Sequence, residues 1–362
     1  MRDIYVQHET ICSKKDWYIS TVIAIKFFKH KRSSDVLSKC TKRVLPFLFI
    51  SGIIFFSQGL TTGCDICGIG GFGGSQGGLS GQSAFSAQTQ KKNQFSLGFL
   101  FEYQDWKHNN PVKAHEQHEE DRDAHSRRSD SVYNAVIGYG VTDNLTLTLQ
   151  FPFVTRQTRQ VEDHGFLGQS ERSSGQGDAI AFGKYRFYDK LFGATAILGV
   201  KAPTGRTSET DKQGERFESE EQSGTGSTDF MFGLAINKIF GRFTVDGSVL
   251  YQLKGSGTQD YEFGDIVRTN LMGAYKIKER GEYPGVQLLV GVNAQFADKD
   301  HENSEKISDT GGTTVFFSPG LSSQLTDRLN SSATIMLPVL QNLGRDHQEV
   351  DYNILLSIGY SF

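Results

Sequence analysis

The last stretch of the chain alternates between apolar and polar or small residues. From Tyr352 to Phe362 every second residue is aromatic or aliphatic, and Leu355 is the one apolar residue between them. A period of two is typical of a β-strand with one apolar face. Aromatic residues stand near both ends of that face, as in strands that cross a lipid layer between two interfaces. The pattern predicts a membrane-spanning strand, although a strand of a soluble sandwich can show the same alternation.

Similar alternation recurs from Gln94 to the end of the chain. It predicts about twelve strands, an even number that closes an antiparallel up-and-down barrel with both ends on one side. The fold class expected is therefore all-β, a transmembrane β-barrel. The predicted strands are 94–106, 130–141, 144–156, 177–188, 192–203, 227–239, 243–254, 263–277, 285–297, 313–323, 329–340 and 350–362.

The gaps between these strands predict how the barrel is oriented. Short gaps at 142–143, 189–191, 240–242, 278–284 and 324–328 alternate with long hydrophilic ones at 107–129, 157–176, 204–226 and 298–312. Short turns face the periplasm and long loops face the outside in bacterial outer-membrane barrels. The chain then ends on the periplasmic side with Phe362. A final strand that ends in phenylalanine resembles the closing strand that the barrel-assembly machinery recognises.

Composition agrees with a barrel in the bacterial outer membrane, surrounded by its lipids. Only 37% of the residues are hydrophobic, yet 40 of 362 are glycine, with 27 Phe and 13 Tyr. A barrel needs about one apolar residue in two, because its lumen is polar. No uninterrupted apolar run reaches the roughly 20 residues of a transmembrane helix. The net charge of -3 gives no reason to expect nucleic acid as a partner.

Alternation also assigns side chains to the two faces of the wall. A charge in hydrocarbon at mid-depth costs about 2–4 kcal/mol, so charged residues within strands are expected to face the lumen. Such residues either line a path for a small solute or fill the pore as interior salt bridges, and both readings stay open. The lumen-lining candidates are Lys184, Arg186, Lys201, Asp229, Asp246, Gln252, Arg268 and Asn270.

The N-terminal part has a different organisation. Basic residues from Lys39 to Arg43, an apolar run to Phe56 and small residues up to Gly63 predict a secretory signal peptide. Because about forty residues precede this signal, we expect the natural start of translation to lie downstream of Met1. The expected organisation is residues 1–63 as extension and signal peptide, 64–93 as a Cys- and Gly-rich periplasmic leader, and 94–362 as the barrel.

Two groups of residues are candidates for metal binding. Cys64 and Cys67 form a C-x-x-C pair, for which a disulfide, a metal or redox pair, lipidation of Cys64, and a leader without chemistry are all open. His115, His118 and His125 lie among carboxylates in the long gap 107–129, and imidazoles at such density can bind zinc, copper or nickel. A charged, solvated outer loop accounts for the same residues. No cofactor is expected.

Short motifs in the second half carry a resemblance to a known family. They are Gly177-Asp178 before the KYRF segment 184–187, K-x-P-T-G at 201–205 and G-T-G-S-x-D at 224–229. SPGLSSQL at 318–325 and IMLPVLQNLG at 335–344 follow them. In order and spacing they resemble the outer-membrane "transporter" family called the MetA-pathway of phenol degradation family, over about residues 94–362. The CDICG sequence after the signal is similar to leaders of Bacteroidetes members.

The resemblance implies an outer-membrane channel of largely uncharacterised substrate, linked by name to aromatic compounds. The motifs also have a structural reading, in which proline and glycine end strands at the outer rim and Asp178 and Asp229 accept backbone N–H bonds there. The function expected is passive transport of small solutes, aromatic or hydrophobic compounds among them. The alternatives are a structural or metal-capturing surface barrel and a barrel enzyme.

An enzyme is the least favoured alternative. A wall-borne hydrolase needs a nucleophile and a base on neighbouring strands, and all nine histidines fall outside the predicted strands. These are His8, His30, His108, His115, His118, His125, His164, His301 and His347. No GxxxxGK[ST] nucleotide-binding loop appears, so movement through the barrel is expected to follow the solute gradient.

Overall fold

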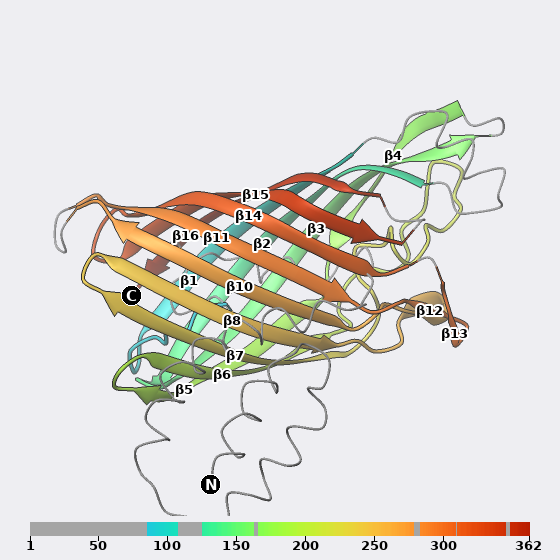
Figure 1. Ribbon diagram of the computed structural model, residues 1–362. Coiled ribbons are helices and arrows are strands. Elements are labelled where there is room, and N and C mark those ends of the chain that lie inside the picture. The colour runs from blue at the N-terminus through green and yellow to red at the C-terminus, as the bar shows by residue number, and fades with distance from the viewer. Residues whose placement is uncertain (1–84, 108–124, 163–165, 279–282, 309, 345–347) are drawn as a thin grey trace, which may run out of the picture. The chain divides into compact units, whose positions relative to one another are not determined.

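The computed structural model describes residues 85–107, 125–162, 166–278, 283–308, 310–344 and 348–362, and within them the strands form a closed barrel (Figure 1). Thirteen strands share one antiparallel sheet; β4 (Phe166–Gln176) pairs only with β3, so twelve build the wall. These are β1 (Phe95–Trp106), β2 (His125–Thr142), β3 (Leu145–Glu162), β5 (Ala179–Asp189), β6 (Gly193–Ala202), β7 (Asp229–Phe240), β8 (Phe243–Leu253), β10 (Ile266–Lys276), β11 (Gly285–Ala297), β14 (Gly312–Gln324), β15 (Leu329–Leu343) and β16 (Val350–Ser361).

The wall closes where the last strand meets the first. β16 pairs with β15 on one side and with β1 on the other. The β1 pairing is in register from Ser96 opposite Ser361 to Asp105 opposite Tyr352 and shifts by one residue before Trp106 opposite Val350. The backbone N–H of Phe362 donates to the carbonyl of Phe95 at 2.8 Å, and the two phenyl rings lie 5.7 Å apart. The predicted all-β barrel of twelve antiparallel strands is confirmed, and the alternating C-terminal segment is its closing strand.

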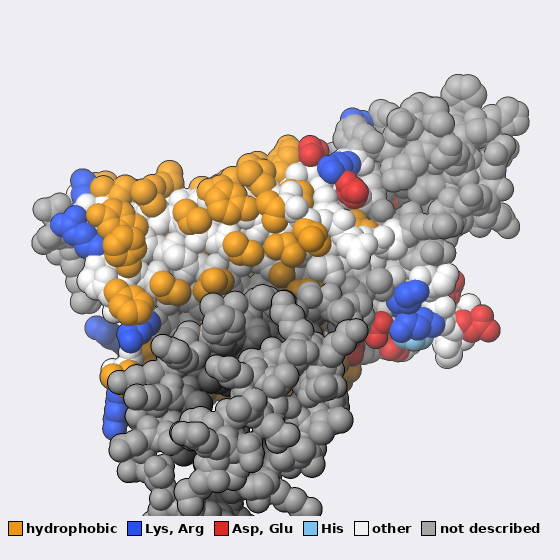
Figure 2. Space-filling model, viewed as in Figure 1, with side chains coloured by type: hydrophobic (Ala, Val, Ile, Leu, Met, Phe, Trp, Pro, Cys, Tyr) orange, Lys and Arg blue, Asp and Glu red, His pale blue; other side chains and the backbone are white. Residues whose placement is uncertain are grey.

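A belt of apolar side chains covers the outside of the wall. Every second residue is apolar and exposed from Leu147 to Phe153 of β3 and from Phe230 to Ile236 of β7. Figure 2 shows such side chains along the wall, with Lys and Arg at the end of the short turns. Exposed apolar surface of this extent indicates contact with lipid. Belt residues include Leu147, Leu149, Phe151, Phe153, Phe230, Phe232, Leu234, Ile236, Leu288, Val290, Val292, Leu356 and Ile358.

The wall continues beyond its outer rim on one side. β2 and β3 are 18 residues long, and β4 pairs with the distal half of β3, so this part of the sheet projects past the other strands (Figure 1). The sequence-based prediction of a loop at 157–176 is therefore wrong. The segment is almost wholly polar, and a strand without an apolar face leaves no hydrophobic period to detect.

The outer loops carry a small sheet of their own. β9 (Tyr261–Glu262), β12 (His301–Glu302) and β13 (Glu305–Lys306) pair, with a short 3-10 turn η1 (Thr258–Asp260) before β9. The predicted strand 263–277 begins three residues later, at Ile266. No helix in the described ranges is long and apolar enough to cross a membrane.

Candidate functional site: the barrel interior

The inner face of the wall carries many polar and charged side chains beside an apolar cluster on β5 to β8. The predicted residues Lys184, Lys201, Asp229, Asp246 and Gln252 are 0% exposed. Arg268 is also buried, and Arg186 and Asn270 are half-buried. All eight share the phase opposite to the apolar belt, so the structure places them on the inner side. Alternation along each strand is the physical reason, because successive side chains leave a strand on opposite faces.

Lys201 on β6 is the centre of a buried ion-pair network in the outer half of the barrel. Its ammonium Nζ lies 3.3 Å from Oδ2 of Asp178 and 3.1 Å from Oδ2 of Asp229. Lys254 approaches the same Asp229 oxygen at 3.4 Å. All four charged side chains are buried, so the two carboxylates are balanced by two ammonium groups without help from solvent.

Hydrogen bonds satisfy the carboxylates of this network. Asp178 accepts the backbone N–H groups of Gly205 at 2.8 Å and Thr225 at 2.9 Å. Asp229 accepts the Ser227 hydroxyl at 2.7 Å and the Gln252 amide at 2.9 Å. Buried charges are tolerated where partners of this kind surround them. The charged side chains in the outer half of the interior are therefore bonded to one another and to the backbone.

The network accounts for the three central sequence motifs at once. Asp178 comes from the Gly-Asp pair, Lys201 and Gly205 from K-x-P-T-G, and Thr225 and Asp229 from G-T-G-S-x-D. A Cβ added to Gly205 would lie 2.6 Å from the Cα atom of Gly224, so glycine is needed at both positions where these two loop segments touch. The contacts support the structural reading of the motifs.

A second set of charged side chains, on β1, β2 and β3, faces the lumen. The Trp106 indole Nε1–H donates to Oδ2 of Asp130 at 2.9 Å, and Nη1 of Arg156 lies 3.9 Å from the same oxygen. Glu102, also buried, interacts electrostatically with Arg268 of β10. None of Glu102, Asp130 and Arg156 is among the predicted lumen residues. Their strand phase is the signal that could have found them.

The segment before β1 enters the periplasmic end of the barrel. Ala87 is fully buried against inner-face side chains of β5 to β8, and its carbonyl accepts the Thr195 hydroxyl at 2.6 Å. The backbone N–H of Gln90 donates to Thr146 Oγ1 at 2.8 Å. We name residues 85–90 the leader segment. It occupies part of the lumen, and its short polar sequence gave no sign of this position.

Tyr261 joins three outer loops. Its hydroxyl lies 2.7 Å from Oε1 of Glu220 and 2.7 Å from Oδ2 of Asp300. The second oxygen of Asp300 accepts the N–H of Gly264 at 2.6 Å. Burial and the charges of Glu220 and Asp300 raise the pKa of Tyr261. Because the folded pKa exceeds the unfolded value near 10, this stabilisation is present below about pH 10 and is lost as pH rises further.

Replacing Tyr261 with phenylalanine is expected to loosen these loops while the wall stays folded, because buried Asp300 loses a donor, at a cost of about 1–3 kcal/mol. Hydrogen exchange should quicken at the backbone N–H groups of Gly264 and Ile307, which donate to Asp300. Exchange within the wall strands should stay slow. Tyr283→Phe, at an exposed tyrosine, is the matched control. Unchanged exchange at both amides would show that Tyr261 does not join the loops.

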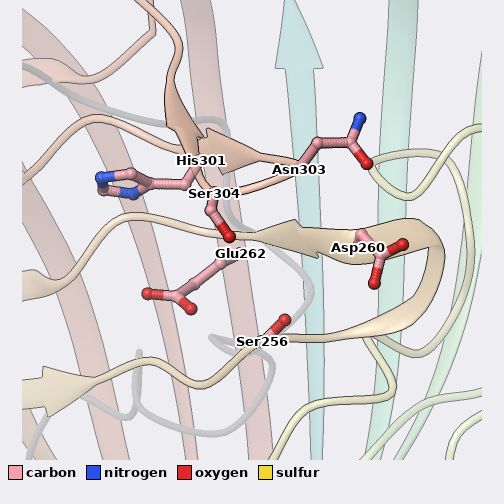
Figure 3. A pocket seen from close by; sticks show the side chains of 6 residues that line it. All are labelled: Ser256, Asp260, Glu262, His301, Asn303 and Ser304. Atoms are coloured by element: carbon pink, nitrogen blue, oxygen red, sulfur yellow. The ribbon is translucent and has the colours of Figure 1, made fainter.

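The small outer sheet holds a polar pocket of about 280 Å³. Figure 3 shows its lining side chains, which come from the segment around β9 and from the β12 hairpin. They are Ser256, Asp260, Glu262, His301, Asn303 and Ser304. Across the residues that the structure describes, no group of three or more His, Cys, Asp or Glu side chains is arranged to hold a metal ion.

The predicted metal candidates are not brought together in the described part of the chain. Cys64, Cys67, His115 and His118 lie outside the described residues, as does the predicted signal peptide. His125 begins β2, but its side chain lies outside the description as well. The expectation that every histidine avoids strands is wrong for His125 and for His301 of β12. Both stand at the outer end, beyond the lipid-facing wall.

Comparisons with known proteins give a likeness of fold. No family model matches the chain, and no curated protein matches it. The COG4313 outer membrane channel from Pseudomonas putida F1 is similar, with 17% identity, a TM-score of 0.55, and coverage of 76% of this chain and 98% of that chain.

Two further solved structures are more distant. The NanC porin has 6% identity and a TM-score of 0.42, covering 73% of this chain and 98% of that chain. The TodX deltaS2S3 mutant monoaromatic hydrocarbon channel has 11% identity and a TM-score of 0.42, covering 81% and 97%. The closed wall, its apolar belt and the likeness to the first channel make the chain a bacterial outer-membrane β-barrel.

Proposed function

We propose that the protein is a passive channel for small polar solutes in the bacterial outer membrane. The observation that carries the proposal is the composition of the inner face, where buried polar and charged side chains recur on the wall strands. A sealed barrel is filled most cheaply by apolar side chains, because each buried polar group needs a partner. Twelve strands also enclose more space than the packed interior of an eight-stranded barrel.

The class of solute follows from the same face. Buried polar and charged side chains, Lys184, Asp246, Thr148 and Gln150 among them, outnumber buried apolar ones such as Phe182, Met231 and Leu250, and this balance suits hydrophilic solutes better than hydrocarbons. The resemblance to the phenol-degradation family is the one reason to consider aromatic compounds. We therefore favour small polar or charged solutes, aromatic acids included, over neutral hydrocarbons.

Three other readings are weaker. A purely structural barrel explains the Lys201 network but not the buried Asp246 carboxylate, whose two oxygens have no hydrogen-bond partner among the described residues. Metal capture by His115, His118 and His125 rests on the sequence pattern alone, because these side chains lie outside the described residues. An enzyme needs a nucleophile beside a base, and the described His301 lies in an outer hairpin, away from the wall. We also propose that residues 1–63 are absent from the mature protein and that the assembly machinery recognises β16.

Liposome swelling tests the channel proposal. Liposomes that contain the folded barrel should take up glycine and small sugars faster than liposomes that contain boiled, unfolded protein. Uptake should fall with solute size, because the leader segment narrows the periplasmic end. Equal rates for folded and boiled protein with every solute, small aromatic acids included, would refute the channel and leave the structural barrel.

A further inference from the structure

Lys238 is a charged residue on the lipid-facing side of the wall. It follows Leu234 and Ile236 in the outward series of β7 and precedes Phe240, and all four side chains are exposed. Its ammonium Nζ lies 5.0 Å from the centroid of the Phe240 ring, a cation–π distance. Because Phe240 ends β7 at a short turn, the lysine side chain points toward the periplasmic edge of the apolar belt. A lysine in this position holds its charge at the level of the lipid headgroups.

Arg242 adds a second cation at the same end of β7. It lies in the short turn between β7 and β8, and its side chain is exposed. Nη1 of Arg242 donates to the carbonyl of Ile277 at 3.4 Å, and the carbonyl of Arg242 accepts the N–H of Lys276 at 2.9 Å. These bonds tie the turn to the end of β10. Figure 2 shows Lys and Arg side chains at this end of the barrel.

The acidic residues of the neighbouring strands do not offset these two charges. In β7, β8 and β10 the acidic residues are Asp229 and Asp246, and both are buried on the inner face. At the end of β5, Asp189 is ion-paired with Arg186 at 2.6 Å. The turn 278–284 has two basic and two acidic residues in its sequence and adds no net charge. The lipid-facing edge at the β7–β8 turn is therefore positively charged, although the whole chain carries a net charge of -3.

Apolar side chains surround the two cations and suit the acyl chains of a lipid. Phe240 and Phe243 are paired across the turn and are 54% and 56% exposed. The Tyr275 ring of β10 lies 4.7 Å from the Phe243 ring, and exposed Ile277 follows it. Aromatic side chains are typical of the membrane interface, and clustered Lys and Arg residues there attract anionic lipids. A zwitterionic headgroup fits less well, because it brings a positive charge of its own.

We propose that Lys238 and Arg242 form a binding site, on the outside of the barrel, for a net-anionic phospholipid of the periplasmic leaflet. The ammonium and the guanidinium both donate charge-assisted hydrogen bonds to the lipid phosphate. The acyl chains lie along Phe240, Phe243 and the belt residues of β7. The site is separate from the lumen and does not depend on the channel function, so either proposal can fail while the other stands.

Native mass spectrometry of the folded, detergent-solubilised barrel tests the site with phosphatidylglycerol and phosphatidylcholine of equal chain length. The wild type should retain phosphatidylglycerol at lower concentrations than phosphatidylcholine. Lys238→Gln should weaken phosphatidylglycerol binding about fivefold, the loss expected for one cation at an anionic lipid surface, and leave phosphatidylcholine binding unchanged. Lys238→Arg keeps the charge and should bind like the wild type. Lys92→Gln is the matched control, because Lys92 is exposed beside the β2–β3 turn at the same end, away from β7.

Three results would overturn the site. Equal retention of the two lipids by the wild type would show that the barrel does not select an anionic headgroup. Equal losses in Lys238→Gln and Lys92→Gln would show that the rim attracts lipid through its overall charge and not at this place. Displacement of phosphatidylglycerol by an equal concentration of glycerol phosphate, which has no acyl chains, would show that a soluble anion is bound instead. If Lys238→Gln does not fold, Arg242→Gln takes its place with the same expected loss.

Discussion

Replacing Lys201 with methionine is expected to destabilise the folded barrel by about 3–5 kcal/mol, the cost of leaving buried charges unbalanced. Lys201 lies within 3.3 Å of two carboxylates, Asp178 and Asp229, and all three side chains are 0% exposed. Methionine keeps much of the volume but removes the charge. The folded form, which migrates faster than boiled protein on gels, should convert to the slower form at a clearly lower temperature.

Two further variants serve as controls for Lys201→Met. Lys190→Met removes an exposed lysine from a periplasmic turn and should leave the conversion temperature unchanged. Adding Asp178→Asn to Lys201→Met should recover part of the loss, because one uncompensated charge disappears with it. A Lys201→Met barrel as heat-resistant as the wild type would show that the network does not stabilise the fold.

Removing the part of the leader segment that precedes Thr89 is expected to raise single-channel conductance several-fold. In the truncated chain a signal peptide is joined directly to Thr89, so that Phe85 and Ala87 no longer occupy the lumen. The anchors of the remaining residues are kept, since Thr89 Oγ1 donates to the carbonyl of Asp143 and Gln90 N–H donates to Thr146. A wider path carries more current, and the Thr195 hydroxyl and the apolar side chains that pack against Ala87 become open to water.

A milder variant checks that the leader segment itself is responsible. Thr195→Val removes the hydroxyl that donates to the Ala87 carbonyl while keeping the shape of the side chain. We expect more frequent switching between small and large conductance steps, with the wall equally stable. Equal conductance of the truncated and full-length barrels would mean that the leader segment does not obstruct the path.

The sequence predicts the wall well because lipid imposes a simple rule on it. All twelve wall strands follow from alternation, with most ends within a few residues, since each must keep one apolar face. The sequence pattern does not predict β4, because its Ser, Arg and Gln residues lie past the rim, where no face of the strand contacts lipid. Strands β12 and β13 of the outer hairpin are two residues long each, which is too short for a periodic pattern to be detected.

The inner face could be predicted in part. The phase of each strand assigns Lys201 and Asp246 to the lumen, but it does not say which inner charges have partners. Asp178 and Asp229 reach Lys201 from different strands, and the backbone N–H donors come from Gly205 and Thr225 in a loop. Such pairings depend on loop conformation and register. For this reason the sequence treats Lys201 and Asp246 alike, whereas the structure gives only Lys201 a full set of partners.

The same limit applies to the leader segment. Residues such as Ser86 and Gln88 carry no periodicity. The segment is held by single hydrogen bonds, from Thr195 to the Ala87 carbonyl, from Thr89 to the Asp143 carbonyl and from the Gln90 N–H to Thr146. Shape complementarity with Met231 and Leu250 adds to these bonds. Neither is visible in a linear pattern.

The central claim, that the interior of this barrel conducts solutes, is tested most directly by single-channel recording of the purified, folded protein in planar bilayers. We predict discrete conductance steps that are small for the full-length chain and larger for the leader-truncated barrel. A bilayer that stays silent with folded protein inserted, for both the full-length and the leader-truncated barrel, would contradict the account.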